Sequence, residues 1–478
     1  MSRVHVIGAG LAGLSAAVRL TEAGRQVVVH EAGPAAGGRA RSYFDRELGL
    51  RIDNGNHLLL SGNIAAMAYL DTIGASGTLT GPRQPLFPFI DIPSGERWTL
   101  RPNPGRLPWW IAAPSRRVPD TGLGDYLRLA AVPRITDDRT VADSLPHGVL
   151  YRRLVEPLAI AALNTPPDQG LARLLGAVLR ETLMRGGGAC LPRFPREGLS
   201  ETLVDPAVAW IRRRGGEVRF GHRIAGLAVE AERVAALHAA DGPEALALGD
   251  AVVLAVPPWV AADLLPGLAG PDEFQAILNI HFAIPAGLGE AGLGEVGRGG
   301  VGSGEARPEG AELGGAGPGQ AGLGGASGGE ARPGGVGSGD AGSGVAGLRE
   351  SGLGEAGFIG LIGGTAEWVF IKPGHVSVTV SAANRLVDRP AETIAALVWP
   401  DVRAALDLGR QEMPRFRVVK EKRATFAATA AQERRRPVPR TALANLVLAG
   451  DWTATGLPAT IEGAIRSGER AAVLLGQR

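Results

Sequence analysis

Hydrophobic and polar positions follow two periods along the chain, which predict strands and helices in alternation near both termini. The apolar run 4–7 predicts a strand, the amphipathic repeat 11–22 a helix and the run 27–31 a second strand. Near the C-terminus, an apolar run at 446–449 precedes a helical repeat at 458–475. Because strands that alternate with helices usually pair in parallel, we expect an α/β fold with a Rossmann-like, doubly wound domain.

The middle of the chain contains both periods, so we expect a second lobe of mixed α+β structure there. A helical repeat covers 206–214. Short apolar runs bounded by Gly or Pro predict strands at 217–220, 251–256, 276–282, 368–371 and 376–380. The last two strands are expected to form a hairpin that turns at Pro373-Gly374.

Glycine is concentrated in one segment that interrupts this pattern. Residues 286–357 contain 29 of the 71 glycines in near-copies of one short repeat, with no aromatic residue and no periodic apolar face. Such a chain buries too little surface to offset its ordering entropy, so we expect a disordered, low-complexity insert rather than a domain. The strands on either side of it are then expected to belong to one sheet, since long surface loops are tolerated.

Composition and charge exclude several classes of protein. A hydrophobic content of 45% is too high for a wholly disordered chain, and 50 basic against 48 acidic residues leave no electrostatic signature for nucleic acid. The single cysteine, Cys190, excludes a disulfide framework and is expected to be a small core residue. The eight histidines show no metal-ligand spacing, so no metal site is expected.

The first chemical motif is Gly8-Ala9-Gly10-Leu11-Ala12-Gly13, which lies between the first predicted strand and helix. Its glycines suit a tight turn, close approach of a pyrophosphate, and close helix–strand packing. The helix N-terminus adds free N–H groups and a favourable dipole. Glu31 follows 18 residues after Gly13, near the spacing of a ribose-binding acid. The motif therefore predicts a dinucleotide site.

Two further motifs favour a flavin dinucleotide over a nicotinamide. Gly37-Gly38-Arg39 follows Glu31 closely, and Gly450-Asp451 ends the buried strand before the last helix. With these motifs in this order, the chain resembles the flavin amine oxidase and carotenoid desaturase superfamily. The resemblance implies FAD, bound non-covalently, and these cofactor-binding residues: Gly8, Gly10, Leu11, Ala12, Gly13, Glu31, Gly38, Arg39, Gly55, Asn56, Ile224, Gly450, Asp451 and Ile461.

The same resemblance implies a division of the chain into discontinuous domains. An FAD-binding domain of the glutathione-reductase type is expected from 1–74, 191–264 and 431–478. A substrate-binding lobe is expected from 75–190, 265–285 and 358–430, with 286–357 as the insert.

Three segments narrow the resemblance to the hydroxysqualene dehydroxylase family of bacterial hopanoid synthesis. They are residues 53–57, 156–166 and 363–370. The resemblance implies reduction of an allylic triterpene alcohol to squalene, with hydride from reduced flavin and an electron donor that the sequence does not identify. The chain departs from the family pattern in the glycine-rich insert and in Asn56, where the family has Gln.

The reaction needs an acid near the leaving hydroxyl, and His57 is the first candidate because histidine titrates near neutral pH. Asp53 is the second candidate. Both residues are also compatible with structural roles, Asp53 in ordering a turn and His57 in packing near the cofactor. Asn164 and Thr165 suit either a hydrogen bond to the hydroxyl or a polar cap before Pro166.

The segment 107–117, with Trp109-Trp110 and Arg116-Arg117, is typical of either an interfacial membrane anchor or a buried aromatic turn. No targeting segment or run of 18 apolar residues is visible, so we expect a cytoplasmic protein that can touch the inner face of the membrane. Its expected partner is a long isoprenoid lipid substrate.

Two alternative functions stay open on the sequence alone. One is a carotenoid or phytoene desaturase, which uses the flavin in the oxidative direction. The other is a non-catalytic isoprenoid carrier on the same scaffold, against which the intact phosphate loop argues.

Overall fold

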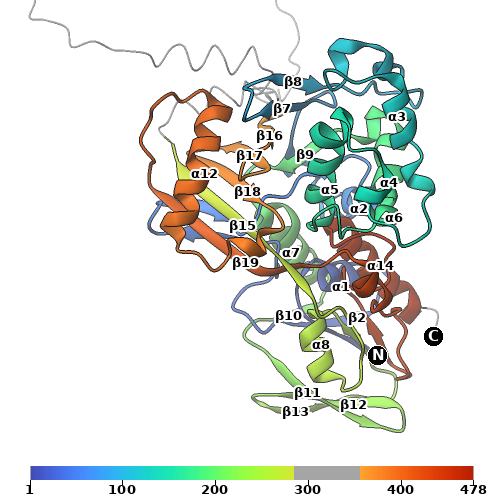
Figure 1. Cartoon of the computed structure of the whole chain (residues 1–478). Coiled ribbons are helices and arrows are strands. Elements are labelled where there is room, and N and C mark those ends of the chain that lie inside the picture. Colours follow the sequence, from blue (N-terminus) through green and yellow to red (C-terminus); the bar gives the residue numbers. More distant parts are fainter. Residues whose placement is uncertain (1, 285–355, 477–478) are drawn as a thin grey trace, which may run out of the picture.

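The computed structural model describes residues 2–284 and 356–476, arranged around two large sheets (Figure 1). The first sheet is parallel throughout and has the order β10-β2-β1-β14-β20. Its strands are β1 (Arg3–Ile7), β2 (Gln26–His30), β10 (Glu217–Arg219), β14 (Ala251–Leu254) and β20 (Leu446–Leu448). The parallel sheet confirms the expected α/β fold class.

Helices cover one face of this parallel sheet, and a small antiparallel sheet covers the other. The helical face packs apolar side chains of β1 and β2 against α1 (Leu11–Glu22), α2 (Ile64–Ile73), α7 (Asp205–Arg213) and α14 (Ile461–Gly476). The other face is covered by α8 (Pro258–Leu264) and by the meander β11 (Ile224–Glu230), β12 (Arg233–Ala239) and β13 (Gly242–Ala245).

The second large sheet has seven strands in the order β19-β15-β18-β17-β16-β7-β8. These are β7 (Phe87–Asp91), β8 (Arg97–Leu100), β15 (Phe274–Ala283), β16 (Phe358–Ile362), β17 (Trp368–Lys372), β18 (His375–Val380) and β19 (Phe416–Phe426). All neighbours are antiparallel except β16 and β7. Helix α12 (Ala391–Leu406) covers one face through apolar residues such as Val398 and Val402.

A helical lobe built mainly from residues 101–190 completes the molecule. Its helices are α3 (Leu123–Leu129), α4 (Val141–Ser144), α5 (Glu156–Leu163) and α6 (Ala172–Glu181), which share one apolar cluster. Remaining elements are the hairpin β3 (Ser42–Asp45) and β4 (Leu50–Asp53), the small sheet β5 (Leu59–Leu60), β9 (Pro192–Pro195) and β6 (Leu79–Thr80), and α13 (Ala430–Arg434). Among the described residues, no helix is both long and apolar enough to cross a membrane.

The element boundaries agree with the pattern and differ mainly at ends. The predicted helix 11–22 is observed without change, and the predicted hairpin is β17–β18, where Gly374 has φ +75°. The last helix begins at Ile461 rather than 458, because the Thr460 hydroxyl accepts a hydrogen bond from the Gly463 N–H and so ends the preceding loop. The predicted strand 251–256 ends at Leu254, two residues early, as the chain turns toward Gly8.

Strands β15 and β16, which flank the glycine-rich segment, do belong to one sheet, as the sequence predicted. They are not neighbours, because β18 and β17 lie between them. Residues 286–355 of the predicted insert lie outside the described residues.

Candidate functional site

The first glycine motif lies where the strand order of the parallel sheet reverses, between β1 and β14. Gly8 has φ +104°, and a Cβ on it would come within 2.6 Å of the Ala255 carbonyl oxygen. A Cβ on Gly13 would lie 1.9 Å from the Gly8 carbonyl oxygen, whereas one on Gly10 would meet nothing within 4 Å. Two glycines therefore allow close packing, and Gly10 leaves space at a position where open α/β sheets bind ligands.

The free N–H groups expected at this loop are available. Helix α1 begins at Leu11, and no side chain caps its first turn, so the N–H groups near Leu11 and Ala12 point out of the helix end. Glu31 stands at the carboxyl end of β2 and stabilises the loop, because its carboxylate accepts hydrogen bonds from Ala9 N–H at 2.9 Å and Gly33 N–H at 2.8 Å.

The second glycine pair lies directly on the first loop. Gly37 N–H donates to the Ala9 carbonyl at 2.8 Å, and a Cβ on Gly38 would lie 3.4 Å from the Gly10 Cα. Both Gly37 and Gly38 have positive φ, which explains the need for glycine. The two motifs that the sequence singled out thus form one continuous backbone surface.

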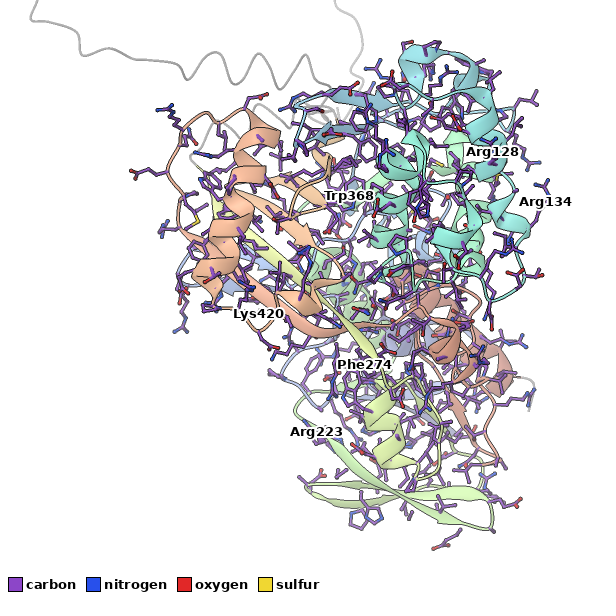
Figure 2. The ribbon with its side chains drawn as sticks, in the orientation of Figure 1. Arg128, Arg134, Arg223, Phe274, Trp368 and Lys420 are labelled. Carbon is purple, nitrogen blue, oxygen red and sulfur yellow. The ribbon has the colours of Figure 1, made fainter. Side chains whose placement is uncertain are left out.

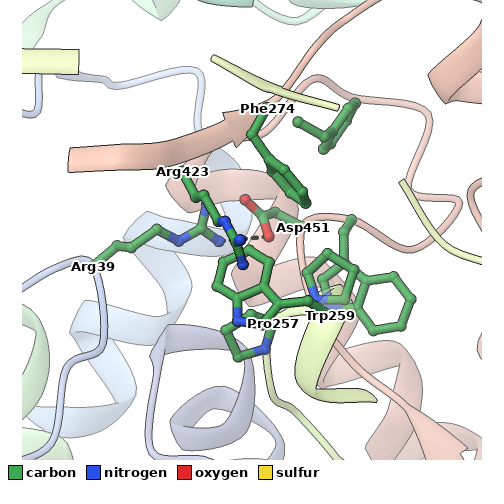
Figure 3. A pocket seen from close by; sticks show the side chains of 9 residues that line it. Arg39, Pro257, Trp259, Phe274, Arg423 and Asp451 are labelled. Carbon is green, nitrogen blue, oxygen red and sulfur yellow. Dashed lines mark hydrogen bonds and ion pairs between the residues drawn. The ribbon is translucent and has the colours of Figure 1, made fainter. Parts of the chain in front are cut away.

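Arg39 joins this surface to the C-terminal motif. Its guanidinium pairs with the buried Asp451 carboxylate at 2.7 Å. Figure 3 shows the pair at the edge of a small, partly open pocket. The pocket is lined by Arg39, Pro257, Pro258, Trp259, Phe274, Arg423, Phe426, Asp451 and Trp452. Sequence reasoning missed Arg423 and Phe274, which come from the seven-stranded sheet and carry no local motif.

The remaining predicted cofactor residues lie at element ends around the same sheet. Gly450 follows β20 with φ +152°, and its N–H donates to Ser467 Oγ on α14 at 2.8 Å. Ile461 begins α14 and the buried Ile224 begins β11.

The segment 53–57 lies against the face of the seven-stranded sheet that α12 leaves uncovered. Asn56 N–H donates to Asn279 Oδ1 at 3.2 Å, and Asn56 Nδ2 donates to Thr379 Oγ1 at 3.0 Å. Asp53 is 3% exposed and pairs with Lys372 Nζ at 2.6 Å. Burial alone would raise the pKa of Asp53, but the Lys372 ammonium holds it below its usual value, so this carboxylate is ionised at neutral pH.

His57 is half-buried and lies near this ion pair. Burial lowers the pKa of His57 to about 4. The Asp53 carboxylate raises this pKa by a smaller amount, and the positive charges of Arg39 and Lys372 lower it further. The imidazole is therefore neutral at pH 7, which differs from the near-neutral titration on which its prediction as an acid rested.

The uncovered face of the sheet has an aromatic half and a polar half. In the aromatic half, Phe87, Phe358, Trp368 and Phe370 of the sheet pack together with Phe194 of β9. The polar half adjoins it on β15 and β18, where His281 pairs across the sheet with Ser377. Six buried polar atoms at or beside this junction have no hydrogen-bond partner among the described residues: Asn56 Oδ1, both ring nitrogens of His281, Trp368 Nε1, His375 Nε2 and Ser377 Oγ. Unpaired buried polar atoms are rare in folded proteins, and a bound polar group is one way to satisfy them.

The side chains of Asn164 and Thr165 are both hydrogen-bonded within the protein. Asn164 Oδ1 accepts from Ala382 N–H at 2.6 Å, and its Nδ2 donates to Thr425 Oγ1 at 3.0 Å. Thr165 Oγ1 accepts from Ala428 N–H and donates to the Leu163 carbonyl. These contacts favour the structural alternative for both residues. Cys190 is buried, and burial raises the pKa of its thiol to about 12, in agreement with a core role.

Comparisons with known proteins find a matching family model and relatives that are similar over nearly the full length of this chain. Residues 11–286 and 372–475 match the family model described as flavin containing amine oxidoreductase. The chain is 46% identical to hydroxysqualene dehydroxylase of Rhodopseudomonas palustris, over 99% of this chain and 98% of that protein. It is 44% identical to the enzyme of the same name from Sinorhizobium fredii, over 98% and 97%. Among solved structures, an oxidoreductase from Methanosarcina mazei has the same fold, with a TM-score of 0.66, 15% identity and coverage of 98% and 99%.

Proposed function

The chain belongs to the hydroxysqualene dehydroxylase family of flavin-containing amine oxidoreductases, and we propose that it reduces hydroxysqualene to squalene. FAD is its cofactor, as the family implies. The structural observation that carries the proposal is the junction of aromatic wall and unpaired polar atoms beside residues 53–57. Such a junction suits a long hydrocarbon that carries one hydroxyl group.

The residues present fit an extended dinucleotide. The open side of Gly10 and the uncapped end of α1 suit a pyrophosphate, and Glu31 stands where a ribose acid is expected. Arg39 lies beside the loop and adds a cation, while its pairing with Asp451 connects the N-terminal and C-terminal segments. We therefore propose the fourteen residues predicted from the sequence as the FAD-binding set.

The domain arrangement proposed from the sequence is compatible with the two sheets. All five strands of the parallel sheet lie in the segments assigned to FAD binding, and all seven strands of the second sheet lie in those assigned to the substrate lobe. The discontinuous segments thus describe two units that meet at residues 53–57 and where the Arg39 guanidinium donates to the Ala424 carbonyl of β19.

The reaction breaks the allylic C–O bond and forms a C–H bond at the same carbon. Reduced FAD supplies the hydride, and with it two electrons, when it is bound. The chain must exclude water, hold the hydrocarbon and deliver one proton to the leaving oxygen, which departs as water. We propose that the aromatic half of the uncovered face holds the hydrocarbon and that Ser377 and Asn56 lie nearest the hydroxyl.

We propose His57 as the proton donor, with Asp53 in a supporting role. Asp53 is ionised and paired with Lys372, so it is poorly suited to give up a proton at neutral pH. Its negative charge does favour the protonated form of the adjacent imidazole.

Anaerobic turnover tests the function directly. The purified protein is reduced with dithionite in the absence of oxygen, hydroxysqualene is added in detergent, and squalene is measured by gas chromatography. We expect stoichiometric reoxidation of the flavin and release of squalene. Flavin reduction by a polyene precursor would indicate a desaturase instead, and protein purified without flavin would indicate a carrier.

We further propose that the helical lobe touches the membrane from which the lipid substrate comes. Leu107 and Trp109 are 82% and 56% exposed, while Trp110 is buried against Tyr126 at 5.2 Å between ring centroids. The segment 107–117 therefore has features of both a membrane anchor and a buried aromatic turn, because Trp109 is exposed and Trp110 lies in the core. Leu127 on α3 is exposed as well, and Arg128 and Arg134 project outward from this lobe (Figure 2).

Vesicle binding checks the membrane proposal. Wild-type protein should sediment with anionic phosphatidylglycerol vesicles, and Leu107→Ser with Trp109→Ser should weaken binding at least about tenfold, since each apolar side chain contributes about 1.5–3 kcal/mol when buried. Phe44→Ser is the matched control, because Phe44 is 60% exposed on β3 in another part of the surface. Equal binding by all three proteins would contradict the proposal.

A further inference from the structure

A row of histidines lies between the parallel sheet and the β11–β13 meander, away from the residues assigned to catalysis. His5 comes from β1 and His30 from the end of β2, and both are 1% exposed among apolar neighbours such as Leu237 and Leu254. His222 follows β10, and Glu244 lies on β13. These residues are far apart in the sequence, which is why no ligand spacing is visible in it.

The side chains converge with the geometry of a ligand set. His5 Nδ1 and His30 Nε2 are 3.1 Å apart. One nitrogen of each imidazole and one carboxylate oxygen of Glu244 all lie within 4.8 Å of one another. Donor atoms bound tetrahedrally at the 2.0–2.1 Å of Zn–N bonds are about 3.3 Å apart, so small side-chain movements complete the geometry.

An outer layer of hydrogen bonds supports the same two imidazoles. His30 Nδ1 lies 3.1 Å from His222 Nδ1, and His222 Nε2 lies 3.4 Å from the Asp241 carboxylate. At metal sites, the second ring nitrogen of a ligand histidine usually makes a hydrogen bond to another polar group. Here that group is His222, which in turn contacts the Asp241 carboxylate.

We propose that His5, His30 and Glu244 form a site for a divalent transition-metal ion, with Zn²⁺ the best match. Two imidazoles and one carboxylate are ligands that zinc accepts, and Glu244 is partly exposed, so a water molecule can fill the fourth position. Arg219 binds one Glu244 oxygen, Oε2, at 2.9 Å, which leaves Oε1 for the metal. The Arg219 charge opposes a cation, but Glu217 also pairs with that guanidinium at 2.8 Å.

The position of the site indicates a structural role close to the nucleotide loop. His30 immediately precedes Glu31, and His222 N–H donates to the Glu31 carbonyl at 2.8 Å. Glu31 N–H donates to the Arg219 carbonyl at 2.9 Å. A metal ion that links β1, β2 and the meander would therefore stabilise the backbone that carries Glu31, without taking part in the reaction.

Without a metal, the same contacts are explained by neutral imidazoles that each donate one N–H to the next, so direct binding must decide. Tag-free flavoprotein is freed of metal by chelation and titrated with ZnCl₂ by calorimetry. We expect one Zn²⁺ per chain, a rise in the melting temperature, and visible d–d bands when Co²⁺ replaces Zn²⁺.

Variants locate the ligands. Glu244→Gln keeps the shape of the side chain and should weaken Zn²⁺ binding at least tenfold, and His222→Ala should weaken it about 10–100-fold as an outer-layer change. His238→Ala is the matched control, because this exposed histidine lies on β12 of the same meander. Flavin content verifies the fold of each variant. No saturable binding by the wild-type protein, or equal binding by Glu244→Gln and wild type, would overturn the proposal.

Discussion

At the scale of single residues, the glycine positions show how far local motifs determine the site. The sequence predicted distinct roles for Gly8, Gly10 and Gly13, and the packing around each agrees, since only Gly10 faces open space. The contact of Gly38 with Gly10 was not visible in the sequence, because it depends on how the chain returns to the loop after β2. Local motifs thus predict which residues come together at this loop but not how they touch.

Gly10→Val should abolish FAD binding while leaving the protein folded. The new side chain would fill space that a ligand needs and would meet no protein atom within 4 Å at its Cβ. Flavin content per chain is measured from the visible spectrum, and folding from circular dichroism. Gly77→Val is the control, since Gly77 is equally open in a surface turn. Full flavin content in Gly10→Val would exclude Gly10 from the site.

The proposed role of His57 as the proton donor predicts how the rate of the chemical step depends on pH. With a pKa of about 4, only the fraction of His57 that is protonated can act as an acid, and that fraction falls about tenfold per pH unit above pH 5. We therefore expect single-turnover flavin reoxidation by substrate to become faster as pH falls from 8 to 5.5. His57→Ala should be about 10²–10⁴-fold slower and lose this dependence. The exposed His147→Ala serves as control, and a pH-independent rate in the wild type would eliminate His57 as the acid.

At the scale of elements, helices and strands followed the hydrophobic pattern where packing agreed with it. Helix α1 was predicted to the residue, because its amphipathic repeat is what the core requires. The segment 107–117 was ambiguous, because a short turn points neighbouring residues in opposite directions and only the contact of Trp110 with Tyr126 decides between them. The Asp53–Lys372 ion pair joins residues 319 positions apart and had no local signal.

The crossing of α1 and α14 depends on one glycine. A Cβ on Gly468 would lie 2.2 Å from the Ala12 carbonyl oxygen, and Ser15 Oγ donates to the Ile465 carbonyl at 2.9 Å at the same crossing. Gly468→Ala should destabilise the protein by about 1–3 kcal/mol through overpacking, and lower flavin occupancy, since α1 carries the phosphate loop. Chemical unfolding measures the loss. Gly476→Ala, at the open end of the same helix, should have little effect, and a neutral Gly468→Ala would show that the helices can separate freely.

At the scale of the whole molecule, the candidate site is assembled from both sheets and both chain ends. The fold class and the cofactor were predictable, because the glycine motifs carry their own context of strand and helix. The substrate face was not, because its polar atoms lie on strands whose sequence indicates only burial. Asn56, Trp368 and Ser377 meet through the pairing of β17 with β18 and the return of segment 53–57 against them. Pairing over such distances is set by the entire sheet rather than by any window of sequence.

The sheet order also determines how much of the glycine-rich segment the fold requires. Because β15, β18, β17 and β16 are successively antiparallel, β15 ends and β16 begins at the same edge of the sheet, three strand spacings apart. Three spacings of about 4.8 Å make roughly 14 Å, which about five extended residues can span. Replacing 286–354 by an eight-residue Gly-Ser linker should therefore preserve fold, flavin content and squalene formation.

The boundary of this deletion is sharp on its C-terminal side. Ala356 is fully buried in the aromatic cluster, and Ile371 N–H donates to the Gly357 carbonyl at 2.9 Å, so both residues are packed against the sheet and do not belong to the connection. By the loop-closure relation, three halvings of the length of a connection change its closure free energy by about 2 kcal/mol at most. The variant with the eight-residue linker should therefore melt at the same temperature as the wild type or slightly higher. A matched deletion that continues through Gly357 should instead lower the melting temperature, because it removes these packed residues. Loss of flavin in the shorter deletion, measured beside the longer one, would show that residues 286–354 contribute to the fold.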